Sequence, residues 1–307
     1  MTVPRPILIA GPTASGKSAL ALAIAERVGG VIINADSMQV YRELRILTAR
    51  PGPEDEARAP HKLYGQVGAA ESYSVARWLD DARREIDLAN GSGARPIVVG
   101  GTGLYFKALT EGLSPVPPIP DAIRAYWRDL LARDGVAEAY RLLAERDAGM
   151  AERLRPSDGQ RIVRALEVHE ATGRSLAEWQ RQPGIPVVRE ADAIRLAVEM
   201  PREELFQRCD RRFDQMMAAG GLEEVRALGR LGLDARLPAM RALGVPSLLE
   251  HLAGRIDLAA AVAAAKQQTR RYVRRQQTWL KRHMISWNCV QLSQSVVLSS
   301  MFDQLID

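Results

Sequence analysis

Short apolar runs alternate with helical patterns in the first third of the chain. Strands are predicted at 5–10, 31–35 and 95–101, and helices at 17–28 and 78–89. Strands that alternate with helices are typical of a parallel sheet with helices on both faces. Ligands of such sheets bind at the carboxyl ends of the strands. We therefore expect the residues that follow these strands to share one site.

A proline-rich stretch, SPVPPIP at residues 114–120, interrupts this pattern. A helical pattern follows, and AIRLAVEM after residue 192 predicts one more core strand before the chain turns helical again to about residue 285. We therefore predict an α/β protein with helices on both faces of a parallel sheet. Its core is expected at 1–113 and 191–307, with a helical insertion domain at 114–190. The last twenty or so residues are weakly charged and cannot be placed from the sequence.

Composition limits the class of protein. The chain has 307 residues, 47% of them hydrophobic, so it can bury a core, and no apolar run approaches the roughly 20 residues of a membrane span. The phosphate-loop motif described next starts so early that we expect no signal peptide. Cys209 and Cys289 are isolated and form no metal-type pair. We expect a monomer in the reducing cytoplasm, with no membrane partner.

Residues 11–18, GPTASGKS, form the most specific short motif. They match the phosphate-loop pattern, with a predicted strand before them and a predicted helix after them. Backbone N–H groups of such a loop converge on one anion, the lysine adds positive charge, and the last hydroxyl suits Mg²⁺. We therefore expect Mg²⁺ as the cofactor, with Ser18 as its ligand. The expected phosphate-binding residues are Gly11, Pro12, Thr13, Ala14, Ser15, Gly16, Lys17 and Ser18.

The motif leaves the reaction open. Kinases and nucleotide triphosphatases with this loop usually have a later strand that ends in Asp to hold Mg²⁺. Here the strand at 95–101 is followed by Thr102, and the strand that ends in Asp is 31–35. Asp36 is therefore a candidate Mg²⁺ ligand, or only a cap or turn residue. Two alternatives remain at this point: an ATP-using kinase or triphosphatase, and a non-catalytic RNA-binding protein.

The positive charge of the chain is concentrated in one segment. The net charge is +5, yet residues 266–282 contain seven Lys or Arg and no acid, and the rest of the chain has a net charge of −2. On a helix, Arg270, Arg274 and Lys281 lie on one face, without acidic partners at i+4. This pattern predicts a surface for a polyanion such as nucleic acid, with a solvated helix face as the alternative.

Seven motifs follow one another along nearly the whole chain, to about residue 283. They are GPTASGKS, NADSMQVYRELRILTARP, APHKLYG, VVGGTGLYFKALTEGLSP, DGQRIVRALEVHEATG, RCDRRFDQMMAAGGLEEVRAL and RRQQTWLKR. In this order they resemble the tRNA dimethylallyltransferase family of the bacterial type. The resemblance implies transfer of a dimethylallyl group from dimethylallyl diphosphate to N6 of adenosine 37, beside the anticodon of tRNA. The anion at the loop is then the diphosphate of the donor.

The resemblance also implies catalytic roles. Asp36 is the family's base for the adenine amine, and the hydroxyl of Thr102 forms a hydrogen bond in the same site. Arg212 reaches the diphosphate, and Arg208 lies one helical turn away. Taken without the family, Thr102 is equally a helix N-cap, and Arg208 is equally a salt-bridge partner of a nearby acid.

Contacts with the anticodon stem-loop are implied for three further parts of the chain. Arg161 and Arg164 lie at i, i+3 on a predicted helix, so both can meet backbone phosphates, although surface arginines are common. Val245 stands where many members have Tyr, and it cannot stack on a base as Tyr can. The tRNA-binding residues that the resemblance implies are Asp36, Ser37, Met38, Gln39, Thr102, Arg124, Gln160, Arg161, Ile162, Val163 and Arg164.

Overall fold

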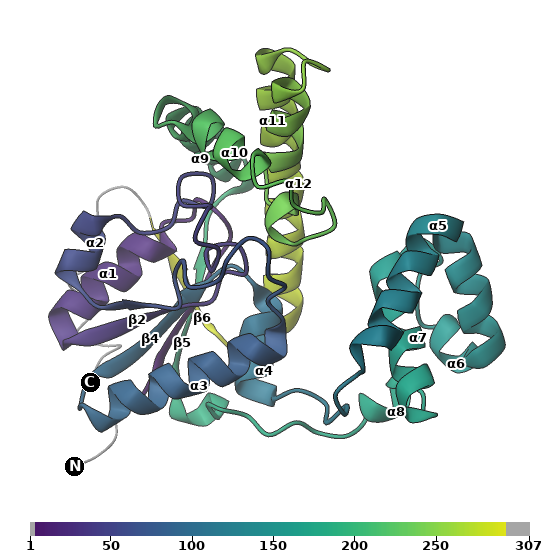
Figure 1. Cartoon of the computed structure of the whole chain (residues 1–307). Coiled ribbons are helices and arrows are strands. Elements are labelled where there is room, and N and C mark those ends of the chain that lie inside the picture. The colour runs from purple at the N-terminus through teal and green to yellow at the C-terminus, as the bar shows by residue number, and fades with distance from the viewer. Residues whose placement is uncertain (1–3, 293–307) are drawn as a thin grey trace. The chain divides into compact units, whose positions relative to one another are not determined.

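The computed structural model describes residues 4–292, and a six-stranded sheet forms the centre of its larger unit (Figure 1). The strand order is β3-β2-β4-β1-β5-β6, and every neighbouring pair is parallel. The predicted α/β class is therefore confirmed. The strands are β1 (Ile7–Ala10), β2 (Gly30–Asn34), β3 (His61–Lys62), β4 (Arg95–Gly100), β5 (Ile194–Glu199) and β6 (Asn288–Gln291).

The central strands were predictable because parallel strands are buried on both faces and read as continuous apolar runs. All four residues of β1 are buried. By contrast, β3 has two residues, and β6 buries only Val290, so neither edge strand has a periodic pattern. The residues after about 285 could not be placed from the sequence, and the structure forms β6 there. Residues 293–307 lie outside the described residues.

Helices α1 and α3–α4 lie on opposite faces of the sheet (Figure 1). Leu20 and Ile24 of α1 pack on Ile7 and Ile9 of β1. On α3, Trp78 stacks on Tyr105 with ring centroids 4.2 Å apart. The helices of this part are α1 (Lys17–Val28), α2 (Pro53–Arg58), α3 (Val75–Gly91) and α4 (Gly103–Glu111), and a 3-10 turn, η1 (Glu190–Asp192), precedes β5.

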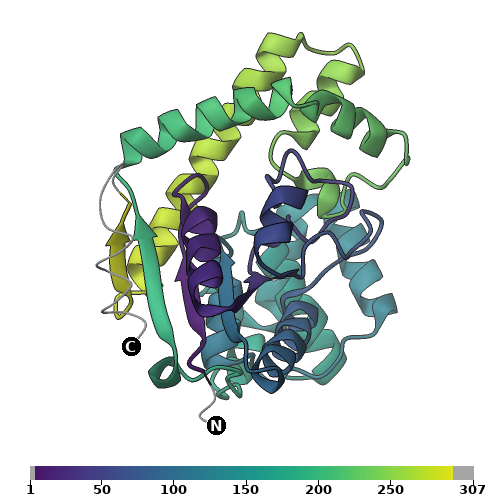
Figure 2. The same cartoon turned by 90° about the vertical axis from the view of Figure 1, so that its left-hand side faces the viewer.

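A group of four helices, here called the helical cap, follows β5. It contains α9 (Arg202–Ala218), α10 (Gly221–Gly229), α11 (Val245–Leu252) and α12 (Leu258–His283), with a 3-10 turn, η2 (Ala239–Arg241). Figure 2 shows α9 and α12 side by side. Val40 and Leu44 of the loop after β2 join Phe213 and Leu248 in the core of the cap. Val245 is fully buried in that core, so its side chain is not available to stack on a base.

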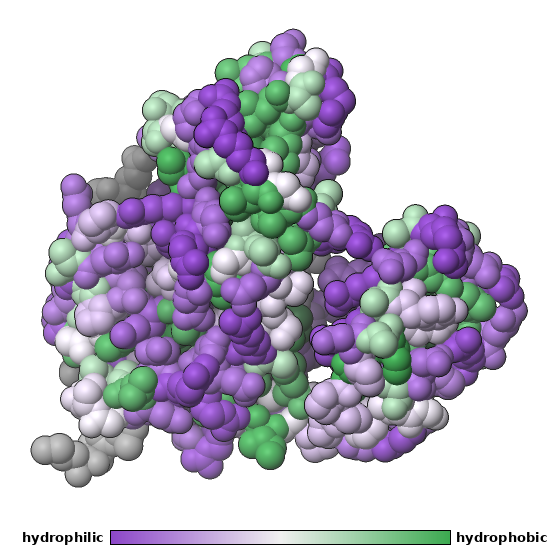
Figure 3. All heavy atoms as spheres, viewed as in Figure 1, coloured by the Kyte–Doolittle hydropathy of each residue, from purple (hydrophilic) through white to green (hydrophobic). Residues whose placement is uncertain are grey.

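Most of the face seen in Figure 3 is hydrophilic over the sheet, and hydrophobic residues gather around α11. No helix within residues 4–292 is both long and apolar enough to cross a membrane.

The insertion is a separate compact unit, residues 111–186, and the core unit comprises residues 1–110 and 187–307. The helices of the insertion unit are α5 (Asp121–Arg146), α6 (Ala148–Ala151), α7 (Gly159–Thr172) and α8 (Leu176–Trp179). Trp127, Leu143 and Leu166 are fully or almost fully buried in its own hydrophobic core. The expected span was 114–190, so the unit begins three residues earlier and ends four residues earlier than expected.

Candidate active site and RNA-binding residues

The phosphate loop, residues 11–18, joins β1 to α1. Gly16 has a φ of 92° and precedes α1, and no side chain caps the N-terminus of that helix. Ala14 has a positive φ of 64°, a conformation that is costly for a residue with a Cβ. Ser15 is fully buried, and its Oγ has no hydrogen-bond partner among the described residues. A strained loop at an uncapped helix N-terminus favours an anion as ligand.

Two cationic side chains are directed to this loop region. Lys17 donates a hydrogen bond to the carbonyl of Pro12 at 3.2 Å. Burial lowers the pKa of Lys17 to about 8, with Asp36 raising it and Arg212 lowering it. Burial also lowers the pKa of Arg212. Two partly buried cations beside one carboxylate leave positive charge that a diphosphate would neutralise.

Asp36 directly follows Asn34–Ala35 at the carboxyl end of β2. The side chain of Asn34 accepts a hydrogen bond from the N–H of Asp36 at 2.8 Å. Oδ1 of Asp36 accepts one from the N–H of Met38 at 2.9 Å, which is the turn role that the sequence left open. Oδ2 receives no hydrogen bond from the described residues. Asp36 is therefore held by one of its two carboxylate oxygens.

Thr102 lies at the carboxyl end of the neighbouring strand β4, just before α4. Its hydroxyl accepts a hydrogen bond from the N–H of Ser37 at 3.0 Å and lies 3.3 Å from Ser37 Oγ. The N–H of Thr102 donates to the carbonyl of Ala35 at 3.1 Å. Thr102 and the Asp36 segment are therefore hydrogen-bonded to one another although they are far apart in the sequence.

Three residues of the helical cap also contact these loops, and sequence reasoning missed all of them. Cys209 donates a weak hydrogen bond to the carbonyl of Thr13 at 3.7 Å, and burial raises the pKa of its thiol to about 11. Burial, then Asp36, raises the pKa of Tyr272, and a side-chain hydrogen bond between Tyr272 and Thr102 lowers it. The side chain of Gln276 forms hydrogen bonds with Thr13 of the phosphate loop and with Gly101, which precedes Thr102. The spacing of residues along a helix does not indicate which of its polar side chains contacts a distant loop, so the sequence pattern could not predict these contacts.

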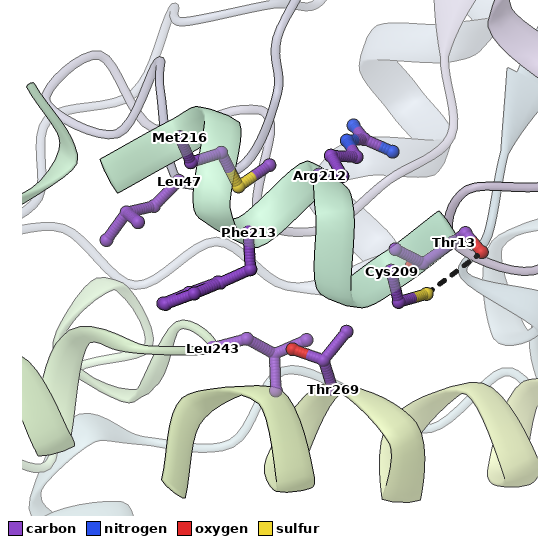
Figure 4. A pocket seen from close by; sticks show the side chains of 8 residues that line it. All are labelled: Thr13, Leu47, Cys209, Arg212, Phe213, Met216, Leu243 and Thr269. Carbon is purple, nitrogen blue, oxygen red and sulfur yellow. Dashed lines mark hydrogen bonds between the residues drawn. The ribbon is translucent and has the colours of Figure 1, made fainter. Parts of the chain in front are cut away.

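A pocket of about 40 Å³ lies next to the phosphate loop (Figure 4). This volume holds about three water molecules. Figure 4 shows Phe213 beside Leu243, whereas Arg212 points away from Phe213. One wall is thus mainly apolar and the other carries the arginine. The lining residues are Thr13, Leu47, Cys209, Arg212, Phe213, Met216, Leu243 and Thr269.

The described residues do not by themselves provide a full set of metal ligands in this region. Within residues 4–292, no group of three or more His, Cys, Asp or Glu could hold a metal ion. Mg²⁺, however, commonly keeps several waters and binds through one or two protein oxygens plus substrate phosphates. Ser18 is exposed at the start of α1, and Asp36 offers one oxygen. These residues fit a Mg²⁺ ion that arrives with a diphosphate.

The expected RNA-binding residues of the insertion unit fall into two groups. On α7, Gln160 and Arg161 are exposed and Arg164 is half-buried. Arg161 lies 3.5 Å from Asp158, and Arg164 lies 3.5 Å from Glu167. Nε of Arg124 is buried and has no hydrogen-bond partner among the described residues. Ile162 and Val163 are 0% and 5% exposed. The prediction that these two bind tRNA is wrong for their side chains, because they pack in the core of the unit.

The segment after Asp36 is likewise divided. Ser37 bonds to Thr102, as described above. Met38 packs against the core of the helical cap. The amide of Gln39 donates to the carbonyls of Thr48 and Ala49 at 2.9 and 3.0 Å, so it holds its own loop.

The basic face of α12 is less free than the sequence indicated. Arg270 forms an ion pair with Asp210, and Lys266 lies 2.6 Å from Asp214, both on α9. The basic face lacks acidic partners at i+4, as the sequence shows, but Asp210 and Asp214 come to it from another helix. Arg274 and Lys281 are exposed, although Arg274 also lies 5.3 Å above the ring of Phe206.

Comparison with known proteins gives one consistent result. A family model described as IPP transferase matches residues 39–283, and one described as isopentenyl transferase matches residues 5–64. The chain is 53% identical to a tRNA dimethylallyltransferase of Azorhizobium caulinodans, over 92% of this chain and 91% of that protein.

Two solved structures are also similar. One is the tRNA isopentenylpyrophosphate transferase of Bacillus halodurans, with 29% identity and a TM-score of 0.68, covering 98% of this chain and 93% of that one. The other is a eukaryotic dimethylallyltransferase captured acting on tRNA, with 27% identity and a TM-score of 0.81, covering 98% and 76%. This chain therefore belongs to the IPP transferase family, and its relative from Azorhizobium caulinodans is a tRNA dimethylallyltransferase.

Proposed function

We propose that this protein transfers a dimethylallyl group from dimethylallyl diphosphate to N6 of adenosine 37 in tRNA. The observation that carries the proposal is the pairing of an anion site with a carboxylate. Lys17 and Arg212 supply positive charge at the phosphate loop, and Asp36 and Thr102 lie at the ends of the adjacent strands. A leaving diphosphate and an adenine amine need these two kinds of group side by side.

The reaction forms a bond between N6 and C1 of the donor and breaks the bond between C1 and the diphosphate oxygen. Negative charge grows on the leaving diphosphate, and the loop N–H groups, Lys17 and Arg212 stabilise it in the transition state. Mg²⁺ held by Ser18 would neutralise part of the same charge. Asp36 accepts the proton that N6 loses, which makes the delocalised amine a better nucleophile.

The test of this function is transfer of label. Purified protein, Mg²⁺, labelled dimethylallyl diphosphate and unmodified tRNA are incubated without ATP, and the tRNA is isolated. Label on N6 of adenosine 37 is the expected result. ATP hydrolysis without transfer would instead support a kinase or triphosphatase, and tRNA binding without either activity would support a non-catalytic RNA-binding protein. We place this activity in the cytoplasm, in which the two free thiols stay reduced, and expect a monomer.

The apolar pocket beside the phosphate loop suits the five-carbon group of the donor. Replacing Met216 with Trp should fill the pocket and raise the KM for dimethylallyl diphosphate roughly 10-fold or more, which corresponds to losing one or two buried methylene contacts. The affinity for tRNA should not change. Gln215→Trp is the matched control, since Gln215 is exposed on the same helix. An unchanged donor KM in Met216→Trp would exclude this pocket as the donor site.

The exposed cations of α12 should contribute to tRNA affinity. In the double variant Arg274→Gln/Lys281→Gln, the slope of log K for tRNA against log salt should fall by about 0.7 to 0.9 for each lost phosphate contact. Turnover at saturating tRNA should be retained. Lys62→Gln/Arg83→Gln removes the same charge from exposed positions on β3 and α3 and serves as the control. An equal slope in both double variants would make α12 a solvated face.

A further inference from the structure

Gln276 of α12 connects the two loops on which the proposed reaction depends. Its side chain is 6% exposed. Oε1 accepts a hydrogen bond from the N–H of Thr13 at 2.9 Å, and Nε2 donates one to the carbonyl of Gly101 at 2.9 Å. Thr13 belongs to the phosphate loop after β1, and Gly101 precedes Thr102 after β4. One amide therefore bridges the donor side and the acceptor side of the site.

Both partners of this amide are backbone groups, so its orientation is fixed. The N–H of Thr13 can only donate and the carbonyl of Gly101 can only accept, which assigns Oε1 and Nε2 without ambiguity. At neutral pH, only glutamine meets both requirements at this length. A carboxylate lacks the donor, a thioether lacks both groups, and asparagine is one methylene shorter.

The turn around Thr102 is built to receive α12 at close range. A Cβ on Gly101 would lie 2.3 Å from Nε2 of Gln276, and a Cβ on Gly103 would lie 2.2 Å from the ring of Trp279. Tyr272, which shares a side-chain hydrogen bond with Thr102, lies four residues before Gln276 on α12. Tyr272, Gln276 and Trp279 thus form one face of the helix at i, i+4 and i+7, and this face lies on residues 101–103.

We propose that Gln276 is a positioning residue for dimethylallyl transfer: it holds the phosphate loop and the Thr102 turn at a fixed separation, so that C1 of the donor and N6 of adenine meet in line. Gln276 does not touch the reacting atoms. The inference rests on the proposed function, because it assigns donor and acceptor to these two loops.

The first test replaces Gln276 with Met, which keeps length and apolar volume and removes both hydrogen bonds. We expect kcat, with both substrates saturating, to fall roughly 10- to 100-fold, the effect of a displacement of about 1 Å between reacting groups. The Kd for tRNA should stay within about 2-fold of the wild type, because no RNA contact is lost. Gln277→Met is the matched control: among the described residues, the side-chain amide of Gln277 donates only to the carbonyl of Met200, at 3.4 Å.

The second test is Gln276→Glu, which gives a signature that a purely structural role does not. The carboxylate can accept from the N–H of Thr13 but repels the carbonyl of Gly101, whereas the carboxylic acid can serve both. Burial raises the pKa of such a carboxyl above the usual 4.3 or so. Relative to the wild type, transfer by this variant should therefore recover as the pH falls from about 8 to about 5.

The outcomes are distinct. If the wild type transfers no label, the proposed function fails. If the wild type transfers label and Gln276→Met has a kcat within about 2-fold of it, or loses no more than Gln277→Met, the positioning role is overturned. If Gln276→Met does not fold, the pH profile of Gln276→Glu decides, and a constant ratio to the wild type overturns the proposal.

Discussion

Replacing Asp36 with Asn should lower the rate of single-turnover transfer by roughly 10²- to 10⁴-fold, the usual contribution of a general base. The variant should still bind tRNA and the donor. The structure makes this a clean substitution, because Oδ1 of Asp36 accepts from the N–H of Met38 and an asparagine oxygen can do the same. What is lost is the charge and the ability to take a proton at the second oxygen.

Magnesium separates the two roles that remain for Asp36. If Asp36 is the base, raising the Mg²⁺ concentration will not restore transfer by Asp36→Asn. If it is a Mg²⁺ ligand, high Mg²⁺ will recover much of the rate, and donor affinity will be the parameter most affected. Asp80→Asn, at an exposed position on α3, is the control and should transfer normally. A normal rate for Asp36→Asn at every Mg²⁺ concentration would remove Asp36 from the mechanism.

Replacing Lys17 with Ala should have the next largest effect, a loss of roughly 10²- to 10³-fold in kcat/KM for dimethylallyl diphosphate. Lys17 is partly buried next to the phosphate loop, so its charge acts on the diphosphate with little screening by water. The Kd for tRNA should change by less than about 2-fold, and Lys62→Ala should behave as the wild type. A collapse of tRNA affinity would mean that the loop holds an RNA phosphate.

The pH profile gives the same prediction an independent readout. Burial lowers the pKa of Lys17 to about 8 in the protein without ligands. Lys17 is therefore cationic below pH 8 and loses its charge above it, so log kcat/KM for the donor should decline as the pH rises through about 8. Lys17→Arg keeps a charge that does not titrate in this range, and its profile should stay flat there. A fall of the same size in Lys17→Arg would assign the pKa to another group.

The amino-acid sequence by itself determined the central part of the fold, and it predicts the anion site. Four buried strands of a parallel sheet are continuous apolar runs, and the phosphate loop is one contiguous segment of eight residues, so both can be read locally. Asp36 and Thr102 could be assigned to one site for a similar reason, because parallel strands bring their carboxyl ends to one edge. The edge strands β3 and β6 could not be predicted from the sequence, because an edge strand buries too few residues to leave a hydrophobic pattern.

Only the tertiary structure decided which polar side chains are available and which are used inside the protein. Ile162 and Val163 lie within a motif that resembles an RNA-binding segment, yet a helix that carries arginines on one side must bury the other, and they are on the buried side. Arg270 finds Asp210 on a different helix, at a sequence separation of 60 residues. Gln276 meets Thr13 and Gly101 from 263 and 175 residues away. Contacts between distant segments leave no periodicity in the chain, because they depend on how α12 packs against the sheet and not on the spacing of residues along it.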